Sequence, residues 1–370
     1  MCSVPSGRRS SFGVAALLVG AVIAVFVAAV APAPRQTGTH PPETHLPVWQ
    51  KGMTYTHGYR HADNLLSAGS RASLQYLKSG LHVEWIALNP FAHQRVHNGP
   101  RIGFGDDPPD DHLRHAIAAA HRLGIKVMLK PHISLVERRD GIWRGSIAME
   151  TEEDWQRWFG DYERFINHYA RLAAASEVEL FCVGVELAGA SLNREADWRR
   201  VIDQVRERYH GPLVYAANWW EEYDLIPFWD ALDYIGVNAF FPLSQTPDPT
   251  LHQLRLSART IATDISLLHQ LTGKPVIFTE IGYKSIRGTS VRPWEWPRRF
   301  EPAVDMGEQA RCYQAVLETF WNEPWFYGMY WWKWFSDLER GGTGHPGFTP
   351  RRKPAERLLA EFYRRPPPHP

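Results

Sequence analysis

Two glutamates stand where a carboxyl group is costly unless it has a chemical task. Glu186 closes the apolar run VELFCVGVE, and Glu280 closes the run KPVIFTE. Each looks like the last residue of a buried strand, where a charge is unfavourable unless something pairs with it. Two carboxyls in one cavity can divide the work of glycoside hydrolysis, because one protonates the leaving oxygen while the other attacks or directs water.

Eight short apolar runs, alternating with longer amphipathic segments, are the elements that would position these glutamates. They predict strands at 51–56, 82–89, 126–132, 178–186, 213–219, 234–240, 275–280 and 328–334. Runs that are apolar throughout suit strands buried on both faces of a parallel sheet. Repeated strand–helix units predict an α/β fold, a single-domain (β/α)8 TIM barrel, whose chemistry lies at the C-terminal mouth. Glu186 then ends the fourth strand and Glu280 the seventh.

The segments between the strands indicate helices and a one-sided distribution of loops. Helical patterns such as DDHLRHAIAAAHRLG begin with acidic residues, and Gly124 stands where a helix C-terminus is expected. The connections that leave the third, seventh and eighth strands are long, whereas those that enter strands are short. Long excursions at one end of a domain are usually functional, so we expect them to surround the mouth.

Side-chain alternation along a strand predicts the direction of each glutamate. Two sets should point into the barrel together: Cys182, Gly184 and Glu186 on the fourth strand, and Val276, Phe278 and Glu280 on the seventh. If these faces are the interior, both carboxyls enter one cavity.

The composition fits one barrel-sized globular domain: 370 residues, 44% hydrophobic and 22% charged. A formal net charge of +1 gives no basic field, so we exclude nucleic acid as a partner. The 16 tryptophans are unusual, because flat rings that also hydrogen-bond suit sugar faces, although we expect most of them to pack in the core. Cys2, Cys182 and Cys312 show no metal or redox spacing, so we expect no cofactor and no disulfide framework.

The first 34 residues have the order of a secretory signal. Arg8 and Arg9 precede an uncharged run at 12–33, which ends near small residues at Ala29 and Ala31. The run is also about 20 residues long, enough to cross a bilayer, so an uncleaved membrane anchor fits equally well. We therefore expect an exported protein, either secreted or attached to the outer face of the cytoplasmic membrane. A polar linker at 35–47, the barrel at 48–364 and a proline-rich tail at 365–370 complete the expected monomer.

Short motifs at the strand ends support a family resemblance. In chain order they are KGMTY at 51–55, KPHI at 130–133, GIWRG at 141–145, GVEL at 184–187, ANW at 217–219, FTEIGY at 278–283 and GMYWWKW at 328–334. With these motifs the chain resembles glycoside hydrolase family 113, a group of clan A retaining glycosidases whose described members are mainly endo-β-1,4-mannanases.

The resemblance implies double displacement on a β-1,4-linked polysaccharide or oligosaccharide, above all β-mannan. Glu186 would be the acid/base and Glu280 the nucleophile, with carboxyls about 5 Å apart as in retaining enzymes. The chain departs from the clan pattern at two places. Many clan members have Asn directly before the acid/base, where this chain has Val185, and several have Tyr after the sixth strand, where it has Phe240 and Phe241.

Other polar and aromatic residues at the expected mouth are candidates for binding the sugar. Lys130 and His132 end the third strand, and their chemistry suits hydrogen bonds to hydroxyls. This chain lacks the Asn and Tyr that other clan members have at the two places named above. We expect their roles to be taken by Asn218, His132, Tyr283 or Asn238. By alternation Trp332 or Trp334 forms the platform under the reactive sugar. Candidates for outer subsites are Trp143, Trp219, Trp294 and Trp296.

Three alternatives remain open at this stage. The barrel could be a catalytically inert glycan-binding or envelope-scaffold protein that keeps the fold without turnover. It could be a β-glucanase or a transglycosylase of the same clan, because loops rather than the fold determine the sugar. A metal-dependent barrel hydrolase is a weaker alternative, since the 17 histidines show no H-x-H spacing at a strand end.

Overall fold

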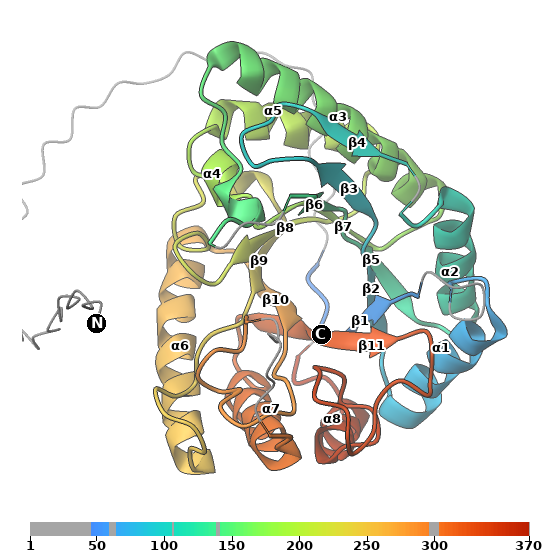
Figure 1. Ribbon diagram of the computed structural model, residues 1–370, viewed down its shortest axis with the longest axis vertical. Helices are drawn as coiled ribbons and strands as arrows, with labels where there is room; N and C mark the ends of the chain where they lie inside the picture. The colour runs from blue at the N-terminus through green and yellow to red at the C-terminus, as the bar shows by residue number, and fades with distance from the viewer. Residues whose placement is uncertain (1–45, 59–63, 106, 138–140, 296–302, 370) are drawn as a thin grey trace, which may run out of the picture. The chain divides into compact units, whose positions relative to one another are not determined.

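The computed structural model describes residues 46–58, 64–105, 107–137, 141–295 and 303–369. Eight parallel strands close into a barrel in the order β1-β11-β10-β9-β8-β7-β5-β2 (Figure 1). They are β1 (Gln50–Thr56), β2 (Trp85–Leu88), β5 (Lys126–Leu129), β7 (Leu180–Val185), β8 (Leu213–Asn218), β9 (Tyr234–Asn238), β10 (Val276–Ile281) and β11 (Phe326–Phe335). Successive barrel strands are neighbours, so the predicted TIM barrel is confirmed.

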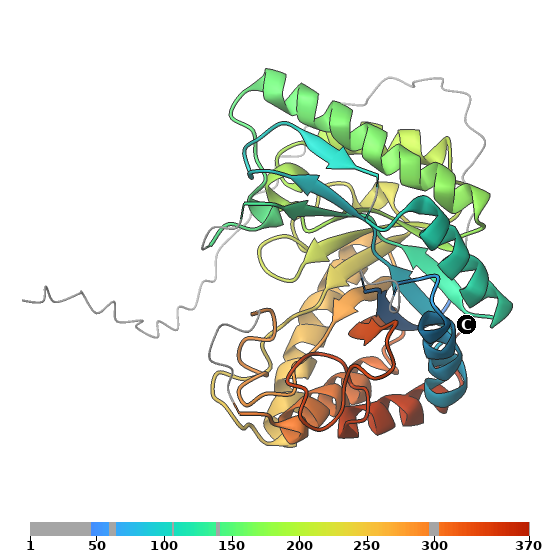
Figure 2. The same ribbon diagram turned by 45° about the vertical axis from the view of Figure 1, so that its right-hand side comes forward.

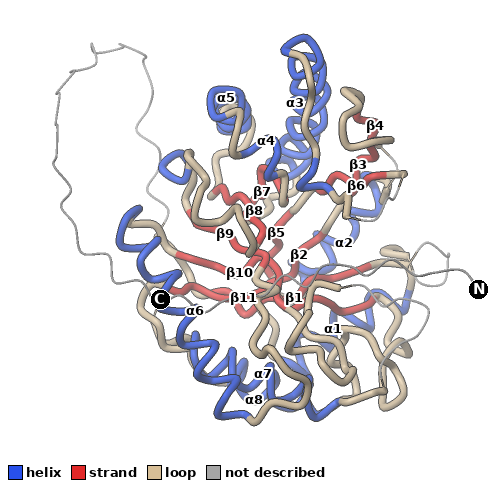
Figure 3. The backbone as a smooth tube through the Cα atoms, turned by 60° about the vertical axis from the view of Figure 1, so that its left-hand side comes forward, coloured by secondary structure: helices blue, strands red, loops and turns tan. Residues whose placement is uncertain are grey.

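Helices surround these strands (Figure 3). They are α1 (Ala68–Leu81), α2 (Asp110–Arg122), α3 (Glu152–Ala175), the short α4 (Ala188–Ser191), α5 (Glu195–Arg206), α6 (Leu251–Thr272), α7 (Met306–Phe320) and α8 (Pro354–Arg364). The connection from β8 to β9 contains only the 3-10 turn η2 (Trp229–Ala231). Local sequence sets the ends: the Thr250 side chain accepts from the Gln253 N–H at the start of α6, and Gly124 after α2 takes φ +65.

The expected signal or anchor at 1–34 lies outside the described residues, and of the linker only residues 46 and 47 fall within them. Among the helices that the structure describes, none combines the length and the apolar character needed to cross a bilayer.

A small sheet that the sequence did not reveal extends the mouth beside α3 (Figure 2). It contains β4 (Ile102–Phe104), β3 (Phe91–Gln94) and β6 (His132–Leu135), in that order. β3 follows β2 after two residues, and β6 follows β5 in the same way. The predicted third strand at 126–132 is thus two strands, and the second of them begins at His132.

The fourth barrel strand does not alternate as the sequence predicted. Cys182 and Val185 both lie in the interior cluster formed by strand residues alone. Gly184 instead faces the helix layer, because a Cβ there would lie 2.7 Å from the ring of Trp198 in α5. The register of β7 against β8 shifts between Cys182 and Val185. The prediction that Gly184 shares a face with Cys182 is therefore wrong, since the irregularity resets the alternation before Glu186.

The seventh barrel strand departs in the same way. Ile277 lies in the interior cluster, whereas Phe278 packs on Phe320 of α7, with ring centroids 4.8 Å apart. The pairing of β10 with β9 shifts between Phe278 and Glu280. The prediction that Phe278 points with Glu280 is wrong, because bulges near barrel rims turn side chains away from simple alternation.

Candidate active site

Glu280 is half of a buried ion pair. Its side chain is 7% exposed, and its Oε1 atom lies 2.5 Å from Nζ of Lys130, which directly follows β5 and is fully buried. Lys130 also donates to the carbonyl of Thr279 at 3.2 Å. Burial raises the pKa of Glu280, while the Lys130 ammonium acts in the opposite direction by stabilising the carboxylate.

Glu186 directly follows β7 and has a left-handed backbone with φ +52, which is uncommon for a residue with a side chain. Its Oε1 atom accepts a hydrogen bond from Nδ2 of Asn218 at 2.9 Å. Its Oε2 atom lies 3.7 Å from Nη1 of Arg144. The bulge in β7 and this backbone conformation together bring the carboxyl to the end of β8.

Arg144 and His132 connect the two glutamates. Nη1 of Arg144 donates to Nδ1 of His132 at 2.7 Å and lies 3.7 Å from Glu186. Nε2 of His132 lies 3.7 Å from Oε1 of Glu280. Both carboxyls therefore belong to one contact network at the mouth, which runs from Glu186 through the two basic residues to Glu280.

The hydrogen bond from Arg144 determines the tautomer of His132. A guanidinium only donates, so Nδ1 accepts and the proton of the neutral ring lies on Nε2. Burial lowers the pKa of His132 well below its usual value, and the charges of Arg144 and Lys130 lower it further. Nε2 has no hydrogen-bond acceptor within the described residues. The site thus holds a buried neutral donor for which none of the described residues supplies an acceptor.

The loop that carries Arg144 is fixed against the segment after Glu186. Arg144 begins the 3-10 turn η1 (Arg144–Ser146), which is followed by Ile147. A Cβ on Gly189 of α4 would lie 2.3 Å from the carbonyl oxygen of Ile147, so only glycine allows this approach. The motif GIWRG gave no sign of a role for its arginine, because nothing along the chain connects this loop with α4.

Comparison with known proteins establishes the family. The profile of Glycoside Hydrolase Family 113 matches residues 53–344. The chain belongs to this family. It is similar to the family 113 β-mannanase AaManA from Alicyclobacillus acidocaldarius, solved in complex with ManMIm, with 31% identity and a TM-score of 0.74 over 85% of this chain and 97% of that one.

Two further solved structures, both of family 113 β-1,4-mannanases, give TM-scores of 0.75 at 27% and 28% identity. Each covers 86% of this chain and 100% of the other. A comparison with curated proteins finds no match. The family assignment makes this protein a glycoside hydrolase.

In this family 113 enzyme, one of the two tryptophans predicted as a platform lies outside the mouth. Trp334 is 1% exposed, donates from Nε1 to Oγ of Ser73 at 2.9 Å and stacks on Tyr76 of α1. Between Trp331 and Trp334, β11 contains one residue more than the stretch of β1 that pairs with it. Both tryptophans therefore pack toward helices. The prediction of Trp334 as a sugar platform is therefore wrong, and the half-buried Trp332 remains as the candidate.

Two of the outer aromatic candidates, Trp219 and Trp294, contact each other on the loops. The ring of Trp219 lies 4.9 Å from that of Trp294 and 5.7 Å from that of Phe241. Trp294 is 40% exposed and Trp143 is 39% exposed. These rings are accessible to a substrate, but their role as subsites stays a prediction. Trp296 lies outside the described residues.

The polar candidates differ in their surroundings. Asn218 contacts Glu186 directly, as described above, whereas Tyr283 is fully buried and its hydroxyl lies 3.5 Å from the carbonyl of Phe241. Asn238 pairs with Glu280 across β9 and β10, and its Oδ1 accepts from Oγ1 of Thr279 at 2.9 Å. Its Nδ2 has no partner among the described residues. Asn218 is thus the candidate that touches Glu186, as Lys130 touches Glu280.

Glu222 is a third carboxyl near the site that the sequence analysis missed. It is completely buried in the loop after β8, and Tyr215, Ser191 and the backbone of Asn218 donate to it. A polar loop sequence, WWEEYD, gave no signal that one of its two glutamates turns inward.

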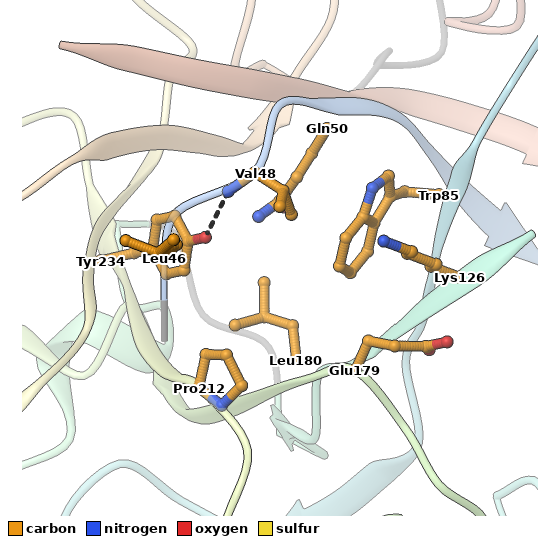
Figure 4. Close-up of a pocket in the computed structure, with 9 residues that line it drawn as sticks. All are labelled: Leu46, Val48, Gln50, Trp85, Lys126, Glu179, Leu180, Pro212 and Tyr234. Carbon is orange, nitrogen blue, oxygen red and sulfur yellow. Dashed lines mark hydrogen bonds between the residues drawn. The ribbon is translucent and has the colours of Figure 1, made fainter. Parts of the chain in front are cut away.

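A pocket at the opposite end of the barrel is not the catalytic site. It has a volume of about 190 Å³ and lies among residues at the starts of strands, including Gln50, Lys126 and Tyr234 (Figure 4). Barrel enzymes place their chemistry at the C-terminal ends of the strands. The pocket contains neither of the predicted catalytic glutamates.

Proposed function

We propose that the enzyme hydrolyses β-1,4-linked mannan with net retention, with Glu186 as acid/base and Glu280 as nucleophile. This proposal rests on a difference between Glu186 and Glu280: their carboxyls belong to one contact network but have different surroundings. Glu280 pairs with the Lys130 ammonium at 2.5 Å, which favours the ionised form that a nucleophile needs. Glu186 accepts from a neutral amide, and a guanidinium lies 3.7 Å away. Different environments allow two carboxyls to take different roles.

The proposed reaction has two steps. Glu280 attacks the anomeric carbon while Glu186 donates a proton to the departing glycosidic oxygen, and a covalent glycosyl-enzyme forms. Glu186 then removes a proton from a water molecule, which attacks the anomeric carbon and releases Glu280. Lys130 stabilises the carboxylate of Glu280 before the first step and after the second.

The mannan substrate is proposed from the relatives, which are described as β-mannanases. Two buried donors that have no acceptor among the described residues, Nε2 of His132 and Nδ2 of Asn238, fit the binding of a polyhydroxylated ligand. Buried donors normally have acceptors, and sugar hydroxyls in the mouth would supply them. Trp332 at the end of β11 is the proposed platform for the apolar face of the sugar.

The test is a panel of mannan, glucan and xylan, with the anomer of the first product followed by NMR. We expect cleavage of mannan that gives the β-anomer, and an α-anomer would contradict the assigned roles. Preference for glucan would change the proposed sugar, and products longer than the substrate would indicate transglycosylation. Binding without cleavage, unchanged in Glu186→Gln and Glu280→Gln, would indicate an inert glycan-binding barrel.

We also propose that the enzyme works outside the cytoplasm, on the basis of the signal-like sequence at 1–34. Cell fractionation with N-terminal sequencing tests this proposal. A mature chain that begins after the A-x-A-like site would indicate secretion, and an intact chain in the membrane fraction would indicate an anchor. An intact chain in the cytoplasm would contradict export.

A further inference from the structure

Glu222 links the barrel strand β8 to the short helix α4 through a single carboxyl group. Its Oε2 atom accepts from the N–H of Asn218, the last residue of β8, at 2.6 Å. Its Oε1 atom accepts from the hydroxyl of Tyr215 at 2.6 Å and from the hydroxyl of Ser191 in α4 at 2.7 Å. Glu221, with φ +53, turns the loop so that Glu222 folds back over the end of its own strand. Three donors thus converge on one buried carboxyl.

Two of these donors lead directly to Glu186. Asn218, whose backbone is held by Glu222, donates from Nδ2 to Oε1 of Glu186 at 2.9 Å. Tyr215, which donates to Glu222, also accepts at 2.8 Å from the N–H of Leu187, the residue after Glu186. A single residue therefore connects Glu222 to each part of the acid/base segment. Asn218 connects it to the carboxyl of Glu186, and Tyr215 connects it to the backbone that follows.

Packing alone does not explain a carboxyl at this position. Within the described residues, no lysine or arginine forms an ion pair with Glu222, although the residue is fully buried. Burial raises the pKa of Glu222 to about 7, despite the hydrogen bonds that oppose this shift. A buried carboxyl without a counter-ion lowers the stability of the fold, which is tolerated where it serves the site.

We propose that Glu222 is a positioning residue that directs the acid/base Glu186 toward the glycosidic oxygen. It acts by holding Asn218 from one side and, through Tyr215, the Leu187 N–H from the other. This inference rests on the proposed function of Glu186. It predicts that the loss of Glu222 impairs proton donation to the leaving group more than it impairs substrate binding.

The decisive experiment compares mannan with an aryl β-mannoside that has a good leaving group, such as dinitrophenolate. Glu222→Gln keeps the size of the side chain but leaves one of its three donors without an acceptor. We expect kcat on mannan to fall about 10- to 100-fold with KM within about threefold. On the aryl mannoside kcat/KM should fall by under about threefold, because kcat/KM reports the formation of the glycosyl-enzyme, and in that step this leaving group departs without a proton.

Two further variants keep the test decisive if Glu222→Gln folds poorly. Tyr215→Phe removes only the hydroxyl between Glu222 and Leu187, and we expect the same dependence on the leaving group with a smaller loss. Glu308→Gln is the matched control, since Glu308 is a buried carboxyl that accepts from the Gly288 N–H and from Ser290, away from Glu186. It should change both substrates by the same factor.

Equal losses on the two substrates in Glu222→Gln and Tyr215→Phe, or no loss in either, would overturn the positioning role. A wild-type enzyme that cleaves neither substrate would instead overturn the proposed function. If the wild type cleaves mannan and Glu186→Gln does not, the proposed function stands, whatever the result for the Glu222 variants. The two failures are therefore distinguishable.

Discussion

Lys130 and Glu280 form an ion pair across the barrel interior, with Nζ and Oε1 2.5 Å apart and neither side chain more than 7% exposed. They come from the third and seventh strands, so the pair spans the mouth from one side to the other. Burying two charges costs free energy, which their attraction and further hydrogen bonds must offset. Removing one partner leaves the other charge buried and uncompensated, which makes the pair sensitive to mutation.

Lys130→Met should therefore move the acid limb of kcat/KM to higher pH. Burial already raises the pKa of Glu280, and loss of the ammonium removes the main opposing effect. A nucleophile must be ionised, so activity falls as the pH drops through its pKa, and a higher pKa moves that fall upward. We expect about a 100-fold loss at neutral pH and a destabilisation of about 3–5 kcal/mol. An unchanged pH profile, measured with urea unfolding in parallel, would show that Lys130 does not support the carboxylate.

Removal of each glutamate should give a distinct kinetic result. In Glu186→Ala, an aryl mannoside with a good leaving group can still form the glycosyl-enzyme, but the second step lacks its base. Added azide should then accelerate turnover and yield a β-mannosyl azide. In Glu280→Ala, azide attacks from the opposite direction and should yield the α-azide. Product configuration by NMR checks both, and exchanged outcomes would reverse the roles of the two residues.

The strand count predicted the place of both glutamates, but alternation gave the wrong direction for the residues that precede them on the same strands. Apolar runs set the order of strands, and order alone places the ends of the fourth and seventh strands at one mouth. Gly184 and Phe278 turned out to face the helix layer, because bulges in β7 and β10 reset the alternation. A bulge depends on the pairing of neighbouring strands, which no single run of residues specifies.

Residues that depend on contacts between loops were harder to predict. Arg144 reaches His132 and Glu186 because its turn packs against Gly189, which is 45 positions further along the chain. Glu222 is buried because Glu221 takes a left-handed backbone, although a glutamate in a polar loop normally indicates exposure. Both features arise from tertiary contacts that local sequence does not encode.

His132 should stay neutral across the range in which an ordinary histidine titrates. Its pKa is lowered by burial, by Arg144 and by Lys130, and its Nδ1 accepts from Arg144. Long-range ¹H–¹⁵N NMR should show the Nε2–H tautomer unchanged from about pH 8 to about pH 5. Because the unfolded chain still protonates this ring, stability should decrease as the pH falls below about 6.5. A midpoint near 6.5 in the folded protein would contradict this picture, and Arg144→Gln should alter the Nδ1 signal.

Glu222 should make the fold less stable as the pH rises. Its pKa is raised from 4.5 to about 7, so the folded state retains a proton that the unfolded chain has already lost. Its contribution is therefore greatest below pH 4.5, and it is lost as the pH rises through about 7. The full shift corresponds to about 3 kcal/mol. Urea unfolding of wild type and Glu222→Gln at pH 5 and pH 8 measures this effect, and a difference between the two proteins that does not depend on pH would exclude it.

Trp332 and Trp334 should separate substrate binding from stability. Trp334 is held between α1 and the barrel by Ser73 and Tyr76, so Trp334→Ala should lower the free energy of unfolding by about 3–5 kcal/mol. Trp332 is half-buried at the end of β11, so Trp332→Ala should raise KM for mannan at least about tenfold with little change in Tm. Steady-state kinetics and thermal unfolding of both variants check the contrast. The opposite pattern would mean that Trp334 faces the substrate despite the irregular register between β1 and β11.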